Sequence, residues 1–574
     1  MMNYELFIQH SAFIIAVFLP ITNYPLYGIR SMQAVHRWLT DKTNKSVMAL
    51  LLGGLLFRGV IAIWLYPGFD EAYYFLYTLH PALSYFDHPP LVALTTGFGP
   101  WLTGEVSQFT IRLGSLILHT GSLVLLYLTS ARLFSTLAAT LTLAIATFVP
   151  IFLVAFGVLT LPDNPLIFFW TASLYCAVNE FFPNNQKRDL AAIKYRPTYR
   201  LAILRLLVGL ACLGKYHGFI LGLGLIGFCL ASPHHRSALT SPWVLLGLGL
   251  FLLTISPILI WNSQHEWVSF RFQSRRGVPG GEYNLIDLFT TFLTGIGYLF
   301  PTLGLPLWWV SLKSALEQVN QKLIKKLLNF DAELNQKQLL ILSVSLPLIL
   351  GFTWLGGYIQ ILPTWAMPGF WGATLLLGYQ VESWQKQYPR RVQRWLRGSA
   401  IAIFSLLLIA LLHMATGTLQ KPSNYALFGG FVSPQDDPST QLFDIQQLRQ
   451  GFASSPVLYS ALQNSSFVFT NRYYLGGQIG MALAPLAKTP ITTFDDDIRG
   501  FAFWSEAEQW LGKDALYITP NSFARKQKLM NKYKSYFKTI EHIGSVPIRR
   551  GGAVIEVFQV YQASTLLKPY PRPY

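Results

Sequence analysis

Acidic residues beside a run of tyrosines are the first candidates for chemistry in this sequence. Asp70 and Glu71 directly follow a long apolar stretch, and Tyr73, Tyr74 and Tyr77 come next. A helix beginning at Asp70 would lay these tyrosines flat at a membrane interface and turn the carboxylates toward the protein. A carboxylate in that setting suits general-base catalysis, whereas an acidic N-cap is the simpler explanation of the same residue types.

Two further acidic positions lie next to prolines. Asp87 and His88 precede a Pro-Pro pair, which predicts a rigid turn. A carboxylate and an imidazole on such a turn bind a metal, hold a phosphate or orient a hydroxyl; the alternative is a capping Asp with an exposed His. Asp163 stands between two prolines at the start of an apolar segment, where it is either a helix cap or a functional carboxylate facing a bundle.

Cations occur where an apolar chain disfavours them. Lys215 and Tyr216 interrupt a long apolar run, and a lysine there is costly unless it snorkels or pairs. A second group of cations follows soon after: Arg271, Arg275 and Arg276. Anion binding is the natural role for both groups, and a surface loop that contacts lipid head groups is the alternative for the arginines.

The composition determines which elements must position these residues. Of the 574 residues, 52% are hydrophobic and only 12% are charged, against about 25% charged in soluble domains. So few charges do not cover a water-facing surface, so most of the chain must face lipid. This excludes an ordinary soluble enzyme and a disordered protein, and three cysteines in apolar runs exclude a disulfide scaffold.

Apolar stretches of about 20 residues, the length that crosses a bilayer, recur as far as residue 416. They predict a polytopic, mainly α-helical membrane bundle with about 12 spans, in a range of roughly 10 to 13. The first stretch lacks a charged leader region and a cleavage site, so it is expected to be a retained span. The expected spans are 11–29, 48–66, 111–131, 136–156, 164–182, 201–214, 218–231, 241–261, 286–311, 338–358, 364–381 and 398–416.

Loop charge predicts the orientation of this bundle. Lysines and arginines gather in the loops 30–46, 183–200, 312–337 and 382–397, which the expected spans place on one side, the cytoplasm. No Lys or Arg occurs between Arg58 and Arg112, on the opposite side. Much of the net charge of +17 is therefore topological, and no nucleic-acid partner is needed to explain it.

The composition changes near residue 417, where polar residues, Pro and Gly become common. Strand-like runs at 467–470, 515–519 and 553–561, with helix-like segments at 473–485 and 521–535 between them, predict a small non-cytoplasmic α/β domain. The expected organisation is an N-terminal span and cytoplasmic loop at 1–46, a transmembrane catalytic domain at 47–416 and the α/β domain at 417–574.

Taken together, several motifs resemble those of membrane glycosyltransferases of the GT-C fold. The chain is similar to the bacterial relatives of protein O-mannosyltransferases, glycosyltransferase family 39, including the branch that transfers aminoarabinose to lipid A. The resembling segments are 69–74, 85–91, 161–166, 213–216, 261–267 and 363–368.

The resemblance implies that a polyprenyl-phosphate donor gives its sugar, with inversion, to a hydroxyl of a lipid, glycan or protein acceptor. It places the site and the C-terminal domain on the periplasmic side of the plasma (inner) membrane. Asp70 matches the catalytic base of such enzymes, and Asp163 matches the acidic residue of their second external loop. Lys215, with Arg271 or Arg275, would then stabilise the phosphate leaving group, and Glu71 is the second catalytic candidate beside Asp70.

One departure concerns the turn before the two prolines. The aminoarabinose branch carries Glu-Lys there, whereas this chain has Asp87 and His88, which puts a phosphate contact there in doubt and argues against aminoarabinose. Asp87 with His265 is an alternative pair of ligands for a divalent metal, although no cofactor is certain.

A polytopic transporter or lipid flippase is the alternative class of function. Transporters place their charged sites near the middle of the bilayer. In this sequence the candidate residues lie at the ends of spans and in external loops, which favours the enzyme.

Overall fold

The computed structural model describes residues 42–183, 195–278, 281–324 and 332–574. Leu50–Tyr574 form one compact unit that contains a helical part and a C-terminal sheet. Met1–Ala49 form a separate unit, of which only the start of helix α3 is described. The expected span at 11–29 therefore lies outside the described residues.

The helical part consists of apolar helices joined by short connections, as a chain in lipid requires, because a helix satisfies its own backbone polar groups. The helices are α3 (Lys42–Trp64), α4 (Phe69–Tyr77), α5 (Leu91–Thr103), α6 (Leu113–Leu133), α7 (Thr136–Phe148), α8 (Asp163–Phe181), α9 (Arg200–Gly214), α10 (Gly218–Ala231), α11 (Trp243–Gln264), α12 (Val268–Gly277), α13 (Leu285–Tyr298), α14 (Pro301–Ile324), α15 (Ala332–Leu355), α16 (Met367–Gln387) and α17 (Pro389–Thr416).

Several of these helices are long and apolar enough to cross a membrane, which confirms the predicted helical membrane bundle. In the described part of the chain, the helices that meet the length and hydropathy of a membrane span are Asn44–Trp64, Thr110–Leu133, Trp243–Gln264, Ala332–Leu355 and Pro389–Thr416. The bent pair α13 and α14 adds a sixth span if it is counted as one, while α7 and α10 are apolar but shorter.

Two of the expected spans are not the continuous helices that the hydropathy predicts. The segment 286–311 bends by 116° between α13 and α14, at Phe300, which has a φ of +66° and precedes Pro301. The segment 136–156 ends its α-helix at Phe148, and a π-helical turn, Phe152–Phe156, follows Pro150. In both cases proline removes a backbone donor and clashes with the preceding turn, and hydropathy does not register this.

The C-terminal domain is built on a five-stranded sheet in the order β2-β1-β3-β5-β4. The first three strands are parallel, and β5 and β4 are antiparallel to their neighbours. The strands are β1 (Phe467–Thr470), β2 (Ile491–Thr493), β3 (Ala515–Pro520), β4 (Phe537–Arg550) and β5 (Ala553–Leu566). The helices are α18 (Ile445–Ser454), α19 (Pro456–Asn464), α20 (Tyr473–Leu483), α21 (Asn521–Ala524) and α22 (Gln527–Lys534).

The strand predictions for β1, β3 and β5 and the helix prediction for α20 are confirmed. The helix expected at 521–535 is divided into α21 and α22. β2 and β4 were not predicted: β2 is only three residues long, and β4 carries charged residues, Gly544 and Pro547 in place of a regular apolar alternation.

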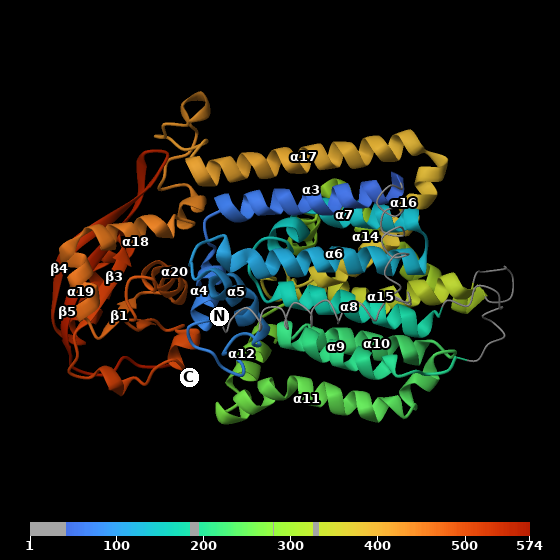
Figure 1. Cartoon of the computed structure of the whole chain (residues 1–574), viewed down its shortest axis with the longest axis horizontal. Helices are drawn as coiled ribbons and strands as arrows, with labels where there is room; N and C mark the ends of the chain where they lie inside the picture. Colours follow the sequence, from blue (N-terminus) through green and yellow to red (C-terminus); the bar gives the residue numbers. More distant parts are fainter. Residues whose placement is uncertain (1–41, 184–194, 279–280, 325–331) are drawn as a thin grey trace, which may run out of the picture. The chain divides into compact units, whose positions relative to one another are not determined.

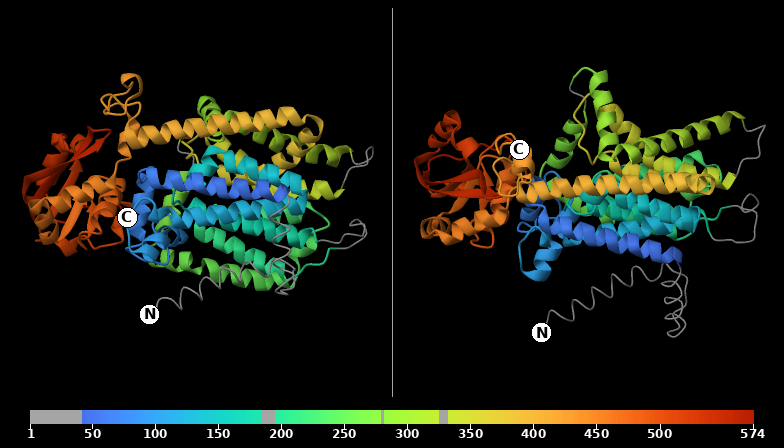
Figure 2. Two further views of the ribbon diagram at one scale, coloured as in Figure 1. Left: turned by 45° about the horizontal axis from the view of Figure 1, so that its top comes forward. Right: turned by 90° about the horizontal axis from the view of Figure 1, so that it is seen from above.

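The sheet domain lies beyond one end of the bundle, the end where α6 begins and α11 and α17 terminate (Figure 1; Figure 2). We call this the domain-facing end. Here α4 packs against α20, and one hydrophobic core contains residues of both. A Cβ on Gly477 would lie 2.6 Å from the backbone nitrogen of Tyr73, so the two helices approach too closely for any side chain at this position.

This packing corrects the expectation that the tyrosines of α4 lie flat at a membrane interface. Tyr73, Tyr74 and Tyr77 are buried, and the Tyr73 ring lies 5.3 Å from that of Tyr473 in the C-terminal domain. The predicted pattern of apolar and aromatic residues was correct, but the C-terminal domain covers it in place of lipid.

Candidate functional site

Glu71 is fully engaged by the fold. Its Oε1 accepts hydrogen bonds from Arg112 Nε (2.8 Å) and the Thr160 backbone (2.9 Å), and its Oε2 accepts from Arg112 Nη2 (2.6 Å) and the Gly68 backbone (2.9 Å). Both side chains of the ion pair are buried. A carboxylate with four donors on two oxygens is poorly available as a base, and it instead holds the start of α4 against the start of α6.

Asp70, the neighbour of Glu71, is in the opposite situation. It is half-buried, and within the described residues its carboxylate has no hydrogen bond or ion pair. Burial raises the pKa of Asp70, the charges of Asp87 and Glu71 add to this shift, and the cations Arg499 and Arg276 oppose it. An unpartnered carboxylate with a raised pKa is what a general base requires.

Asp87 is held on every side. It is completely buried, and its Oδ1 accepts hydrogen bonds from the hydroxyls of Tyr77 and, at 3.5 Å, Tyr73. Its Oδ2 receives Arg499 Nη1 at 3.3 Å, and Gln273 Nε2 donates to its backbone carbonyl at 2.6 Å. The turn predicted before the two prolines is therefore rigid because α4, α12 and the C-terminal domain all hold it.

Arg499 is a residue of this site that the sequence did not reveal. It belongs to the C-terminal domain, stands 412 positions from Asp87 in the sequence and has a φ of +46°. Its guanidinium also contacts Asp497 and stacks on the Tyr473 ring, 3.7 Å from the centroid. No local pattern marks it, because its function depends on a contact between two distant parts of the chain.

Lys215 and Asp163, predicted separately, lie together. The Lys215 ammonium donates to both carboxylate oxygens of Asp163 at 2.9 Å and to Thr364 Oγ1 at 3.3 Å, and both charged side chains are buried. Lys215 ends α9 and Asp163 begins α8, so the two helices bring the pair to the domain-facing end. The lysine therefore pairs with a carboxylate, which offsets the cost of burying it.

His88 directly follows Asp87, and its ring lies 5.4 Å from that of Tyr74. The Nδ1 of its half-buried ring is enclosed but has no hydrogen-bond partner in the described part of the chain. Burial, together with the charges of Lys215, Arg499 and Arg276, lowers the pKa of His88 well below its ordinary value. The imidazole is neutral at pH 7, so it offers a polar atom but no positive charge.

The three arginines of α12 differ in exposure because they lie on different sides of the helix. Arg271 is 55% exposed and pairs with Glu266 at 3.6 Å, and Arg275 is exposed as well. Arg276 is half-buried, lies over the Trp365 ring at 5.4 Å and acts electrostatically on Asp70. The role predicted for Arg271 or Arg275 at a phosphate stays a prediction, and the cation of α12 that acts on Asp70 is Arg276.

The remaining candidate residues, His265 and Tyr216, are both half-buried. His265 stacks on Trp261 at 4.1 Å, and its Nδ1 donates to the carbonyl of that residue at 2.7 Å. Tyr216 is half-buried with its ring 5.5 Å from that of Phe270, and burial raises the pKa of Tyr216 to about 12, so the phenol stays protonated.

The donor set does not fit the metal site that was considered for Asp87 and His265. The Asp87 carboxylate already receives two tyrosine hydroxyls and an arginine, so it has little capacity left for a metal ion. Among the described residues, no three His, Cys, Asp or Glu side chains are grouped to hold a metal ion.

The bundle with its C-terminal sheet domain has the GT-C fold, as the likeness to solved structures shows. Residues 87–261 match the family model described as dolichyl-phosphate-mannose-protein mannosyltransferase. ArnT from Cupriavidus metallidurans has the same fold: its apo structure matches with a TM-score of 0.57 and 14% identity, covering 90% of this chain and 98% of that one. Its structure bound to undecaprenyl phosphate matches with a TM-score of 0.59 and 14% identity, covering 90% and 97%. No curated protein matches the sequence.

Proposed function

We propose that this protein transfers a sugar from a polyprenyl-phosphate donor to an acceptor hydroxyl with inversion, and that Asp70 is the general base. The observation that carries the proposal is the state of Asp70: its half-buried carboxylate has no partner among the described residues, its pKa is raised, and cations of two separate segments, Arg276 and Arg499, act on it. The match to a mannosyltransferase family model and the ArnT structure with undecaprenyl phosphate support the donor class.

In this mechanism Asp70 accepts the proton of the acceptor hydroxyl while that oxygen attacks the anomeric carbon. The bond from the anomeric carbon to the phosphate oxygen breaks, and the polyprenyl phosphate leaves with the electron pair. The leaving group is already anionic, so it needs charge stabilisation more than protonation. We assign that role to Arg276, because Lys215 is engaged by Asp163 and Thr364.

Glu71 and Asp163 are assigned positioning roles. Glu71 fixes α4 through Arg112, which keeps the neighbouring Asp70 in place. Asp163 holds Lys215 beside the 363–368 segment through Thr364. A cavity of about 370 Å³ opens beside that segment. It is lined by apolar residues such as Phe352, Pro363 and Phe370 and by polar ones such as Asp287, Thr291 and Gln360, and we assign it to the donor lipid.

The proposed site faces the periplasm. The ends of α8 and α16 and the starts of α9 and α17, which flank loops rich in Lys and Arg, lie at the other end of the bundle (Figure 1), and the positive-inside rule assigns that end to the cytoplasm. The donor lipid then presents its sugar at the domain-facing end, where the C-terminal domain closes over α4.

The test is turnover by purified protein in vesicles that contain undecaprenyl-phosphate hexoses and pentoses, with and without EDTA. We expect consumption of one donor, and we expect Asp70→Asn to lose it while still binding the donor. Asp436→Asn, which changes an exposed carboxylate far along the chain, is the matched control. Wild-type rates from Asp70→Asn would show that the base is misassigned, and the EDTA arm tests a requirement for metal.

A further inference from the structure

A loop that follows the last span exposes large apolar side chains. Between α17 and Asp436 the only charged residue is Lys421, yet Tyr425, Leu427, Phe428 and Phe431 are 64%, 52%, 94% and 67% exposed. We call residues 420–432 the aromatic loop. A contiguous apolar surface of this kind is costly in water, and it indicates a contact that buries it.

The backbone holds the aromatic loop in this shape. Leu427 and Phe431 donate backbone hydrogen bonds of 2.8 Å to Thr418 and Leu419. Phe428 has a φ of +53°, a left-handed conformation that is unfavourable for a residue with a side chain. The loop therefore presents Phe428 outward at a conformational cost that its own hydrogen bonds sustain.

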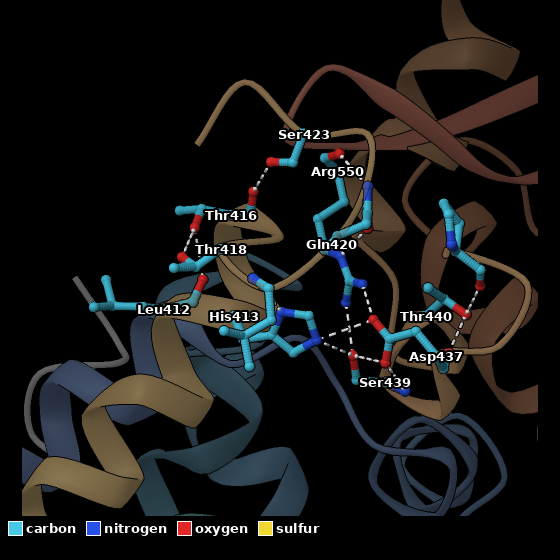
Figure 3. Close-up of polar contacts among 12 residues, drawn as sticks. Leu412, His413, Thr416, Thr418, Gln420, Ser423, Asp437, Ser439, Thr440 and Arg550 are labelled. Atoms are coloured by element: carbon cyan, nitrogen blue, oxygen red, sulfur yellow. Dashed lines mark hydrogen bonds and ion pairs between the residues drawn. The ribbon is translucent and has the colours of Figure 1, made fainter. Parts of the chain in front are cut away.

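A buried polar network joins the aromatic loop to the C-terminal domain (Figure 3). Arg550, at the end of β4, donates to Gln420 at 2.9 Å and pairs with Asp437. His413, in the last turn of α17, contacts the same carboxylate at 3.0 Å. The loop is thus fixed to both the last span and the sheet domain.

A second apolar surface is found on α5. Leu94, Phe98, Trp101 and Leu102 are exposed at helical spacing, while Val92, Thr96 and Gly99 on the other side are buried. The helix contains no charged residue. Its 13 residues extend only about 20 Å, less than the roughly 30 Å of a bilayer core, so α5 does not span.

Both surfaces lie at the domain-facing end of the bundle. The aromatic loop projects sideways at the level where α17 ends, and α5 lies beside α4 at the same end (Figures 1 and 2). Leu406 and Ile409 are exposed on α17, which is long and apolar enough to span a membrane, so we expect them to face lipid, and the aromatic loop follows this helix along the chain.

We propose that the aromatic loop and the exposed side of α5 insert into the lipid interface of the leaflet beside the C-terminal domain, and that they set the depth of the site. Tyr and Trp favour this zone of a bilayer, as Tyr425 of the loop and Trp101 of α5 would, and Lys421 suits anionic head groups. The network of Figure 3 connects the loop to the sheet domain, so the position of the loop in the membrane would fix the position of that domain. The same domain contributes Arg499 to the site.

Collisional quenching tests the insertion directly. A bimane label on Phe428→Cys is compared with one on Val457→Cys, an exposed apolar position of α19 in the sheet domain. The full chain is placed in phosphatidylcholine–phosphatidylglycerol vesicles, and the chain without an added cysteine serves as the blank, since Cys212 and Cys229 are buried and Cys176 is half-buried.

We expect brominated acyl chains to quench the label at 428 several-fold more than the label at 457, and aqueous iodide to do the reverse. Equal access of iodide to both labels would overturn the proposal. Protection of the 428 label from both quenchers would overturn it as well, because that outcome means that a second copy or another protein covers the loop.

A functional test of depth rests on the proposed function. Phe428→Ser with Phe431→Ser is expected to raise the KM for a long-chain donor in vesicles several-fold and to leave the rate with a short-chain, water-soluble donor unchanged. Val457→Ser is the control. An unchanged KM for the long-chain donor overturns the depth-setting role, whereas no turnover of either donor by the wild-type chain would count against the proposed function itself.

Discussion

Arg499 Nη1 lies 3.3 Å from Oδ2 of Asp87, and this ion pair joins the C-terminal domain to the loop between α4 and α5. Asp87 is completely buried and Arg499 is nearly so. The C-terminal domain is therefore part of the candidate site and contributes a cation to it. The same guanidinium opposes the rise in the pKa of Asp70 and adds to the effect of burial in lowering the pKa of His88, so its charge affects the whole group.

Removal of the Arg499 charge is expected to damage both stability and activity. Arg499→Gln leaves Asp87 buried without its partner, at a cost of about 3 kcal/mol, which thermal melting in detergent measures. The double variant Arg499→Gln with Asp87→Asn should recover part of this loss, because no uncompensated charge then remains. A melting temperature equal to wild type in the single variant would contradict the pairing.

The pH dependence of turnover follows from the raised pKa of Asp70. The base acts when it is ionised, so kcat/KM should fall on the acid side with an apparent pKa above the ordinary aspartate value of about 3.9. Arg499 and Arg276 oppose the shift, so Arg276→Gln is expected to move the acid limb to higher pH. Arg271→Gln should leave the apparent pKa of the acid side unchanged. The same apparent pKa in both variants would exclude Asp70 as the titrating base.

The raised pKa of Asp70 also affects how folding stability depends on pH. The direction is opposite to that for a salt-bridged carboxylate, whose pKa is lowered. A folded pKa above the unfolded one means that protonated Asp70 favours the fold, so its contribution is full below about pH 4 and is lost as pH rises through the folded pKa. Asp70→Asn should therefore melt no lower than wild type at neutral pH. A clear loss of melting temperature would mean that the carboxylate stabilises the fold.

Glu71 should behave differently from its neighbour. Glu71→Gln leaves the buried Arg112 without a counter-charge, and we expect a loss of about 3–5 kcal/mol in unfolding free energy. Any fall in turnover should then accompany the fall in melting temperature. Asp70→Asn, in contrast, should lose turnover alone, and a stable but inactive Glu71→Gln would restore Glu71 as a catalytic candidate.

The arginines of α12 provide a matched series for donor binding. Arg276→Ala is expected to weaken binding of undecaprenyl phosphate by about tenfold or more, since a hydrogen bond to a charged group is worth about 1.5–3 kcal/mol. Arg271→Ala and Arg275→Ala, which remove exposed cations from the same helix, should change it little. Equal losses in all three would indicate a general electrostatic effect, which added salt would screen.

The class of fold and most candidate side chains were predictable from the sequence. Low charge and long apolar runs require a helical membrane protein, because a chain in lipid must satisfy its backbone internally. Alternation and turn residues indicated β1, β3 and β5 of the C-terminal domain. Prolines and acidic residues at the ends of spans marked Asp70, Asp87 and Asp163, since charge is costly in lipid wherever it has no function or partner.

Only the tertiary structure decided what each side chain contacts. Asp70 and Glu71 are adjacent in sequence. Asp70 has no partner in the described part of the chain, whereas Glu71 is saturated by Arg112 and two backbone amides, because the start of α6 reaches only Glu71. Helical phase turned Arg276 toward the site and Arg271 toward solvent. Arg499 joins Asp87 across 412 positions, a pairing that depends on packing between α4 and α20 and that no local pattern encodes.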